Sequence, residues 1–152
     1  NVIMTRTFSK VFGPGGMRLG WVYAPESVTN LFNRIRMPFN VSAAAQAAGI
    51  AALADRKHTA RAVAHNARWR EWLAKRVVKM GLEVLPSVAN FVTVAFPTRQ
   101  RMLAADKFLN ARGIIVRQIG KYGLPRHLRI TVGKADETRM VAKALEQFLS
   151  RS

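Results

Sequence analysis

The sequence predicts an α/β chain in which helices connect an N-terminal strand–turn–strand segment to a compact α+β module. Three features of its 152 residues lead to this fold class. Two short runs rich in β-branched and aromatic residues flank a turn at residues 13–16. Apolar residues recur at helical spacing between residues 57 and 80, which indicates one long amphipathic helix. Beyond Gly81 the pattern changes to strands and helices in the order ββαββα.

The N-terminal segment is expected to form two strands and a short helix. Residues 2–8 predict a buried strand, and because no cap or turn precedes them, we expect further sequence upstream. Glycine supplies positive φ and proline interrupts regular structure, so residues 13–16 predict a turn. Residues 18–24 predict a second strand closed by a proline, and residues 27–36 predict a helix that Pro38 stops.

Two more helices are expected before the C-terminal module. The alanine-rich run at residues 43–54 consists almost entirely of helix formers and predicts a buried helix. Residues 57–80 predict the amphipathic helix, with Gly81 as its left-handed C-terminal residue. Trp69 and Trp72 on this helix are expected to lie in the core.

The C-terminal half is expected to hold four strands and two helices and to be able to fold alone. The predicted strands are residues 82–85, 90–96, 114–117 and 127–132, and the predicted first helix is residues 102–112. Acidic side chains favour the start of a helix, so the last helix is expected to begin near Asp136 and Glu137. Its expected buried face consists of Val141, Leu145 and Phe148.

The composition excludes several classes of protein. The chain has no cysteine, which excludes disulfide scaffolds, thiolate zinc sites and cysteine nucleophiles. No apolar run approaches the ~20 residues that cross a bilayer, and the N-terminus lacks the ordered regions of a secretory signal. We therefore expect a cytoplasmic protein that does not bind membranes.

The 25 basic and 8 acidic side chains give a net charge of +17, and the basic residues are densest at residues 56–79. Their alternation with apolar residues favours the solvated face of a helix. A nucleic-acid surface is a second interpretation, although no DNA or RNA motif accompanies it, and a pocket for an anionic small molecule is a third. His58 and His65 lie seven residues apart without a third ligand nearby, so no metal site is expected.

The most informative residues are Thr7, Ser9, Lys10 and Arg18. A strand end would place Lys10 at the edge of a sheet, where α/β proteins bind ligands and where a neutral amine can act as a nucleophile. The hydroxyls and the Arg18 guanidinium offer donors to an oxyanion such as phosphate. The lysine precedes the glycines, unlike in a P-loop, and Arg18 stands where a dinucleotide motif needs glycine. The alternative is a solvated lysine beside an ordinary hairpin.

These residues belong to a pattern, Thr7-x-Ser9-Lys10, Phe12-Gly13 and Arg18-x-Gly20. It resembles the cofactor-lysine signature of fold-type I aminotransferases, which use pyridoxal phosphate, and most of all the histidinol-phosphate aminotransferases. The resemblance extends over essentially the whole chain, through residues 38–41, 87–92, 113–117 and 128–133. In one departure, Pro14-Gly15 stands where many members of the family have Leu-Ala.

The resemblance implies a role for each candidate residue. Lys10 would bind pyridoxal 5'-phosphate covalently and carry the proton that moves during amino transfer. The cofactor phosphate would be held by Thr7, Ser9 and Arg18. Arg129 would grip the substrate carboxylate as a bidentate fork, and Arg117 is a candidate for binding the substrate phosphate.

The resemblance also implies a domain organisation and a reaction. Residues 1–75 would be the last strands and helices of the large cofactor-binding domain with its connecting helix, and residues 76–152 the small α+β C-terminal domain. The reaction would transfer an amino group between histidinol phosphate and 2-oxoglutarate in histidine biosynthesis, in a homodimer. Other site residues of the family would lie upstream of residue 1, so we expect the isolated chain to be inactive.

Two alternatives to this reaction stay open. One is an aromatic aminotransferase or a phosphothreonine decarboxylase with the same signature and fold. The other is a non-enzymatic basic module in which the helix at residues 56–79 contacts nucleic acid.

Overall fold

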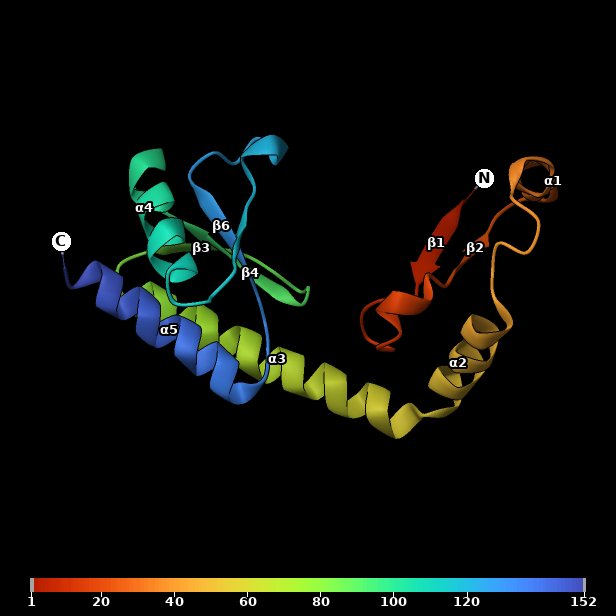
Figure 1. Ribbon diagram of the computed structural model, residues 1–152, viewed down its shortest axis with the longest axis horizontal. Coiled ribbons are helices and arrows are strands. Elements are labelled where there is room, and N and C mark those ends of the chain that lie inside the picture. Colours follow the sequence, from red (N-terminus) through yellow and green to blue (C-terminus); the bar gives the residue numbers. More distant parts are fainter. Residues whose placement is uncertain (1, 152) are drawn as a thin grey trace. The chain divides into compact units, whose positions relative to one another are not determined.

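The computed structural model describes residues 2–151, and the chain divides into two compact units, Asn1–Val63 and Ala64–Ser152. Helix α3 (Arg56–Lys79) crosses this division. The domain boundary expected after residue 75 also falls inside α3, and the assignment of the two parts to domains of an aminotransferase stays a prediction. Figure 1 labels the elements of both units and colours them along the sequence.

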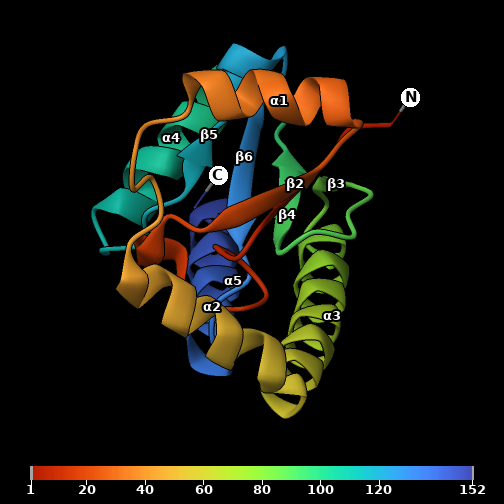
Figure 2. The same cartoon turned by 90° about the vertical axis from the view of Figure 1, so that its right-hand side faces the viewer.

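The N-terminal unit consists of a hairpin followed by two helices. Its elements are β1 (Met4–Thr7), the 3-10 turn η1 (Gly15–Met17), β2 (Gly20–Tyr23), α1 (Glu26–Ile35) and α2 (Ala43–Ala54). The strands pair antiparallel, with Met4 opposite Tyr23 and Thr7 opposite Gly20, and lie side by side in Figure 1, while Figure 2 shows β2 together with α1 and α2 of the same unit. Helix α2 begins where the Ser42 hydroxyl accepts the Ala45 amide, because an uncapped amide would lack a partner.

Two burial predictions for this unit are wrong. All four residues of β1 are exposed, and α2 buries only Ala45 and Gly49, while Ile50 remains 72% exposed. Both segments are rich in apolar residues, but such residues are buried only where another layer of the protein covers them. A sheet of two strands supplies no such layer within residues 2–63.

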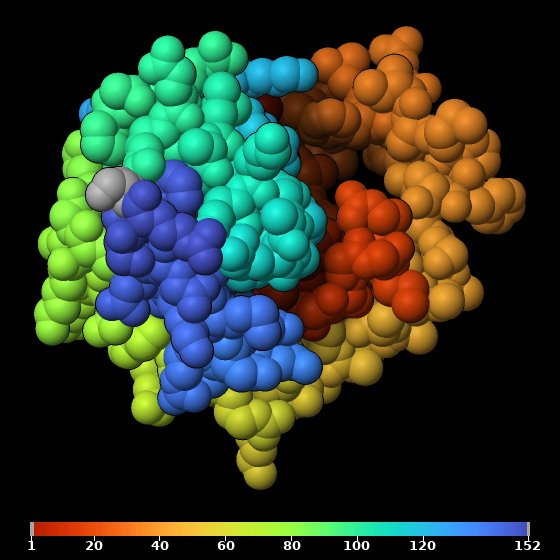
Figure 3. All heavy atoms as spheres, turned by 60° about the vertical axis from the view of Figure 1, so that its left-hand side comes forward, coloured from red at the N-terminus to blue at the C-terminus, as the bar shows by residue number. Residues whose placement is uncertain are grey.

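The C-terminal unit confirms the predicted ββαββα order. After α3 come the elements β3 (Glu83–Leu85), β4 (Phe91–Ala95), α4 (Arg99–Asn110), β5 (Arg117–Gln118), the 3-10 turn η2 (Gly120–Tyr122), β6 (His127–Thr131) and α5 (Ala135–Leu149). The strands form one antiparallel sheet in the order β3-β4-β6-β5. Helices α4 and α5 pack against each other, and their atoms adjoin in Figure 3.

The core of this unit lies between one face of the sheet and the helices. Strand β4 contributes Val92 and Val94, which lie opposite Ile130 and Leu128 of β6. The helices fill the other side with fully buried side chains that include Leu73, Val77, Met102, Leu109 and Leu145. Alternation along each strand therefore directs the remaining strand side chains to the opposite face of the sheet.

Two predictions for this unit need correction. Residues 114–117 do not form one strand, because Gly113 turns the chain at positive φ and Ile114 enters the core without a strand partner, so β5 starts only at Arg117. Trp69 is buried as expected, but Trp72 is 36% exposed. The helix period explains this difference. Trp72 follows Trp69 by three residues, a rotation of about 300° around the helix axis, and therefore lies at the margin of the stripe formed by the buried residues Trp69, Leu73 and Val77.

Within residues 2–151, no helix is both long enough and apolar enough to cross a membrane.

The close approach of the two hairpin strands depends on Gly20. A Cβ atom built on Gly20 would lie 2.7 Å from the backbone oxygen of Arg6 in β1. A paired backbone atom cannot rotate away as a side chain can, so we predict that Gly20→Ala destabilises the hairpin by about 1–3 kcal/mol. The measurement is urea unfolding together with amide exchange of β1.

Gly16→Ala is the matched control for this prediction. A Cβ atom on Gly16 would meet no atom within 4 Å, so its expected effect is within about 0.5 kcal/mol. Equal destabilisation by the two substitutions would contradict the steric explanation.

Candidate functional site

The structure brings together three of the predicted site residues in the N-terminal unit. The Thr7 hydroxyl donates to the Ser9 hydroxyl at 2.9 Å, and the Ser9 amide donates to Thr7 Oγ1 at 3.0 Å. The Arg18 Nη1 atom lies 3.5 Å from Ser9 Oγ. We call these three side chains the hydroxyl–guanidinium cluster. They offer an anion two hydroxyls and one positive charge.

The backbone around this cluster explains its position. Phe8, between Thr7 and Ser9, is buried against Phe12, and its amide donates to the Leu19 carbonyl. This bond joins the end of β1 to the approach to β2, so the two sides of the cluster are linked by main chain.

Arg18 itself is held in an unusual conformation. Its φ is 54°, in the left-handed region that non-glycine residues rarely adopt, and its Nη1 donates to the Gly15 carbonyl at 2.6 Å. This bond directs the guanidinium toward Ser9 rather than away from the turn. Left-handed residues of this kind cost free energy and concentrate at functional sites.

Lys10 lies close to this cluster in the chain. The sequence predicted Lys10 at the end of a strand, but the structure does not place it there. Strand β1 ends at Thr7, and Lys10 belongs to the turn that follows, where its carbonyl accepts the Gly13 amide at 3.0 Å. Its side chain is exposed. The turn, and not the edge of a sheet, therefore positions the Lys10 amine, and its role as a nucleophile stays a prediction.

Arg117 and Arg129, the other two predicted site residues, lie directly opposite each other in the C-terminal unit. The register of β5 and β6 pairs them, and β4 places Thr93 on the other side of Arg129. All three therefore occupy the sheet face that points away from the core. Like charges directly opposite in a sheet destabilise it, which is a cost that a bound anion would remove.

Arg129 is the more enclosed of the two arginines. Its Nε atom is buried and has no hydrogen-bond partner among residues 2–151. Its guanidinium carbon lies 5.1 Å from the centre of the Phe91 ring. Arg117 is instead exposed, and its Nη2 donates to the Tyr122 hydroxyl at 3.2 Å.

Sequence reasoning assigned no role to Phe91 or Tyr122. The signal for Phe91 was its alternation with Val92 in a predicted strand, but its proximity to Arg129 follows only from the pairing of β4 with β6. The contact of Tyr122 with Arg117 depends on η2, which the sequence did not predict.

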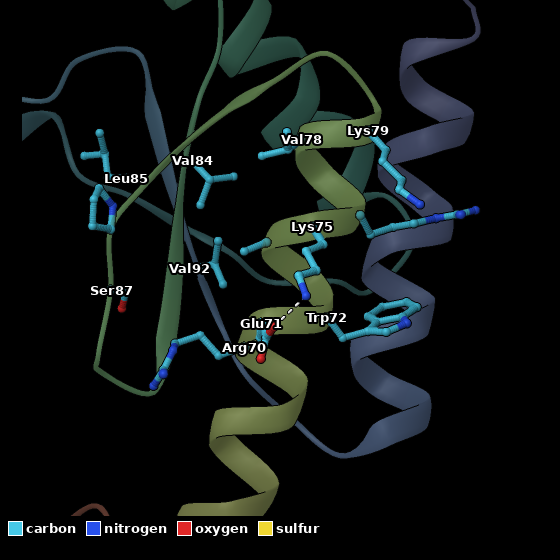
Figure 4. Close-up of a pocket in the computed structure, with 13 residues that line it drawn as sticks. Arg70, Glu71, Trp72, Lys75, Val78, Lys79, Val84, Leu85, Ser87 and Val92 are labelled. Atoms are coloured by element: carbon cyan, nitrogen blue, oxygen red, sulfur yellow. Dashed lines mark hydrogen bonds and ion pairs between the residues drawn. The ribbon is translucent and has the colours of Figure 1, made fainter.

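A separate groove of about 860 Å³ lies between α3 and β3 and contains none of the predicted site residues (Figure 4). Its floor is apolar, with Trp72, Val84 and Val92. On its rim Lys75 donates a hydrogen bond to Glu71, which lowers the pKa of that carboxyl. This geometry offers apolar surface but no group arranged for chemistry.

The described residues give no support for a metal centre. Within residues 2–151, no three or more His, Cys, Asp or Glu side chains form a group that could hold a metal ion. His65 lies 3.0 Å from the Gly133 carbonyl through its Nε2 atom, a structural contact between α3 and the loop before α5.

Comparison with known proteins gives a consistent result. The family model described as aminotransferase class I and II matches residues 1–145. The histidinol-phosphate aminotransferase of Rhodospirillum centenum is 55% identical over 150 residues, which cover 98% of this chain and 41% of that protein. That of Paramagnetospirillum magneticum is 48% identical over 151 residues, which cover 98% of this chain and 42% of that protein.

A solved structure agrees with these relatives. The histidinol-phosphate aminotransferase of Sinorhizobium meliloti, in complex with pyridoxal-5'-phosphate, matches this fold with a TM-score of 0.91 at 32% identity. The match covers 99% of this chain and 42% of that one. The mixed α/β fold class is therefore confirmed, and the chain spans less than half the length of the relatives it matches.

The enclosure of Arg129 leads to a stability prediction. Because its buried Nε lacks a partner and Arg117 faces it, we expect Arg129→Met to raise the free energy of unfolding by about 1 kcal/mol. Urea unfolding followed by tryptophan fluorescence measures this change.

Arg126→Met is the matched control. The Arg126 guanidinium donates to the Phe96 carbonyl at 2.8 Å and lies 3.5 Å from Glu83, so its loss should lower stability. If both substitutions lower stability equally, the cost assigned to Arg129 is wrong.

Proposed function

This chain belongs to the aminotransferase class I and II family, and on that premise we propose that it carries part of the active site of a histidinol-phosphate aminotransferase. The reaction would move an amino group between histidinol phosphate and 2-oxoglutarate, in histidine biosynthesis. The high identity to relatives of that name over nearly the whole chain supports this choice over an aromatic aminotransferase or a phosphothreonine decarboxylase. The protein would act in the cytoplasm as a homodimer.

The observation that carries the proposal is the hydroxyl–guanidinium cluster in the chain segment around Lys10. Thr7, Ser9 and Arg18 each offer a hydrogen-bond donor that suits a phosphate, and Ser9 Oγ lies 2.9 Å from Thr7 Oγ1 and 3.5 Å from Arg18 Nη1. A phosphate monoester has oxygen acceptors for all three. These residues therefore fit the phosphate of pyridoxal 5'-phosphate, and Lys10 would hold the same cofactor covalently.

Lys10 would also move the proton. When bound, pyridoxal phosphate supplies a ring that accepts the electron pair left when a substrate carbon loses its proton. Once the substrate amine has replaced Lys10 on the cofactor, the freed Lys10 Nζ atom would take that proton from the substrate carbon and pass it to the cofactor carbon that had held the lysine. Exposure of Lys10 in a turn gives its long side chain the freedom to do both.

Arg129 and Arg117 would bind the anionic ends of the substrates. A guanidinium presents two parallel N–H groups to a carboxylate, and the buried Nε of Arg129 has no partner among the described residues that a carboxylate would have to displace. Arg117 would contact the phosphate of histidinol phosphate, at the cost of its bond with Tyr122. Both interactions would offset the repulsion between the two arginines.

We propose that the two parts of the chain belong to the two domains that the family resemblance implies. Residues 1–75 would belong to the large cofactor-binding domain and residues 76–152 to the small domain. The family resemblance supports this division, because the lysine signature lies in the first part and the ββαββα module in the second.

Reductive trapping tests the role of Lys10. The 152-residue chain is incubated with pyridoxal phosphate, reduced with borohydride and digested for mass spectrometry. We expect the adduct on Lys10, its loss in Lys10→Ala and its retention in Lys57→Ala, the control at another exposed lysine. Arg18→Ala should raise the half-saturating cofactor concentration about 10-fold, since a charged hydrogen bond is lost. Equal labelling of many lysines in the wild-type chain would contradict the assignment.

Substrate assays test the reaction. With cofactor, histidinol phosphate and 2-oxoglutarate, we expect the isolated chain to form no glutamate above the Lys10→Ala control, because it spans less than half of its relatives. The same chain, placed in the full-length histidinol-phosphate aminotransferase of Rhodospirillum centenum instead of the 150 residues that it matches, should form glutamate. Release of carbon dioxide from phosphothreonine, or transfer only from aromatic amino acids, would overturn the substrate assignment.

A further inference from the structure

The Phe91 ring lies against the arginine that we assign to the substrate carboxylate. Phe91 pairs with Thr131, two residues beyond Arg129 on β6, so Phe91 and Arg129 are diagonal neighbours on the same face of the sheet. Diagonal neighbours are within reach when one side chain is aromatic or long. The 5.1 Å between guanidinium carbon and ring centre falls inside the ~6 Å range of a cation–π contact.

Among the described residues, no hydrogen bond to the Nε atom fixes the orientation of this guanidinium. The Nε atom of Arg129 is buried and has no hydrogen-bond partner in the described part of the chain. Arg117, directly opposite, repels it and is itself held by the Tyr122 hydroxyl. The guanidinium therefore lies between a repelling charge and an attracting ring, and the ring decides where it rests.

We propose that Phe91 is a positioning residue, which orients the Arg129 guanidinium and thereby sets the affinity of the site for a substrate carboxylate. This inference rests on the proposed function, since it takes Arg129 as the carboxylate ligand. An arginine that is already oriented loses less side-chain freedom when the carboxylate binds, so the ring lowers the entropic cost of binding.

The test uses the 152-residue chain labelled with nitrogen-15, with 2-oxoglutarate as the probe. The resonance of the Arg129 Nε–H group is identified by its loss in Arg129→Lys. In the absence of probe, Phe91→Leu should shift this resonance, because the ring current disappears while an apolar side chain stays. Phe91→Tyr keeps the ring and should restore the resonance to near its wild-type position.

Titration with 2-oxoglutarate then measures affinity. We expect Phe91→Leu to raise the dissociation constant about 3- to 10-fold and Phe91→Tyr to restore it, as for the loss and return of a cation–π contact. In the Arg129→Lys background, Phe91→Leu should cause less than half of its effect in the wild-type chain.

Phe108→Leu is the matched control, because its ring also lies over an arginine, Arg112, but in α4 and its C-terminal turn. It should leave the affinity unchanged. If the wild-type chain does not bind 2-oxoglutarate, both the carboxylate role of Arg129 and this inference fall. If the wild-type chain binds but Phe91→Leu binds equally well, or Phe91→Tyr does not restore affinity, only the role of Phe91 falls.

Discussion

The alternation of side chains along β4 and β6 is the constraint on which the C-terminal unit depends. Val92, Val94, Leu128 and Ile130 point to the helices, so their neighbours must point the other way. A slip of one residue would bury Arg129 among the helices and expose the core. The hydrophobic effect therefore fixes the register, and the register in turn places Arg129 between Phe91 and Arg117.

Both candidate sites contain features that reduce stability. Arg18 adopts a left-handed backbone conformation, and Arg129 has a buried nitrogen without a partner and a second arginine opposite it. Sequences that satisfy local rules elsewhere tend to break them where a ligand binds. These costs fall on three of the residues that the sequence pattern or its resemblance had singled out, Arg18, Arg117 and Arg129, and the anion binding that we propose at both places would explain why these residues are retained.

Anion binding does not have to explain most of the net charge of +17. Helix α3 buries Trp69, Leu73 and Val77 on one stripe, which confirms an amphipathic helix whose basic residues mostly face outward. Several of these charges have local partners, as in the contacts of Arg76 with Glu146 and of Lys75 with Glu71. Basic residues on α3 are therefore accounted for by its solvated face, whereas Arg18 and Arg129 have environments that this face does not explain.

The sequence by itself determined most of the elements, the ββαββα order and the family, because periodicity, glycine turns and the lysine signature are local patterns. It could not determine burial of β1 and α2, since burial depends on which layer covers an apolar segment. The true start of β5 and the contacts of Arg129 with Phe91 and Arg117 were also decided only in the tertiary structure. Strand pairing joins residues far apart in the chain, and no local pattern encodes which residues will face each other.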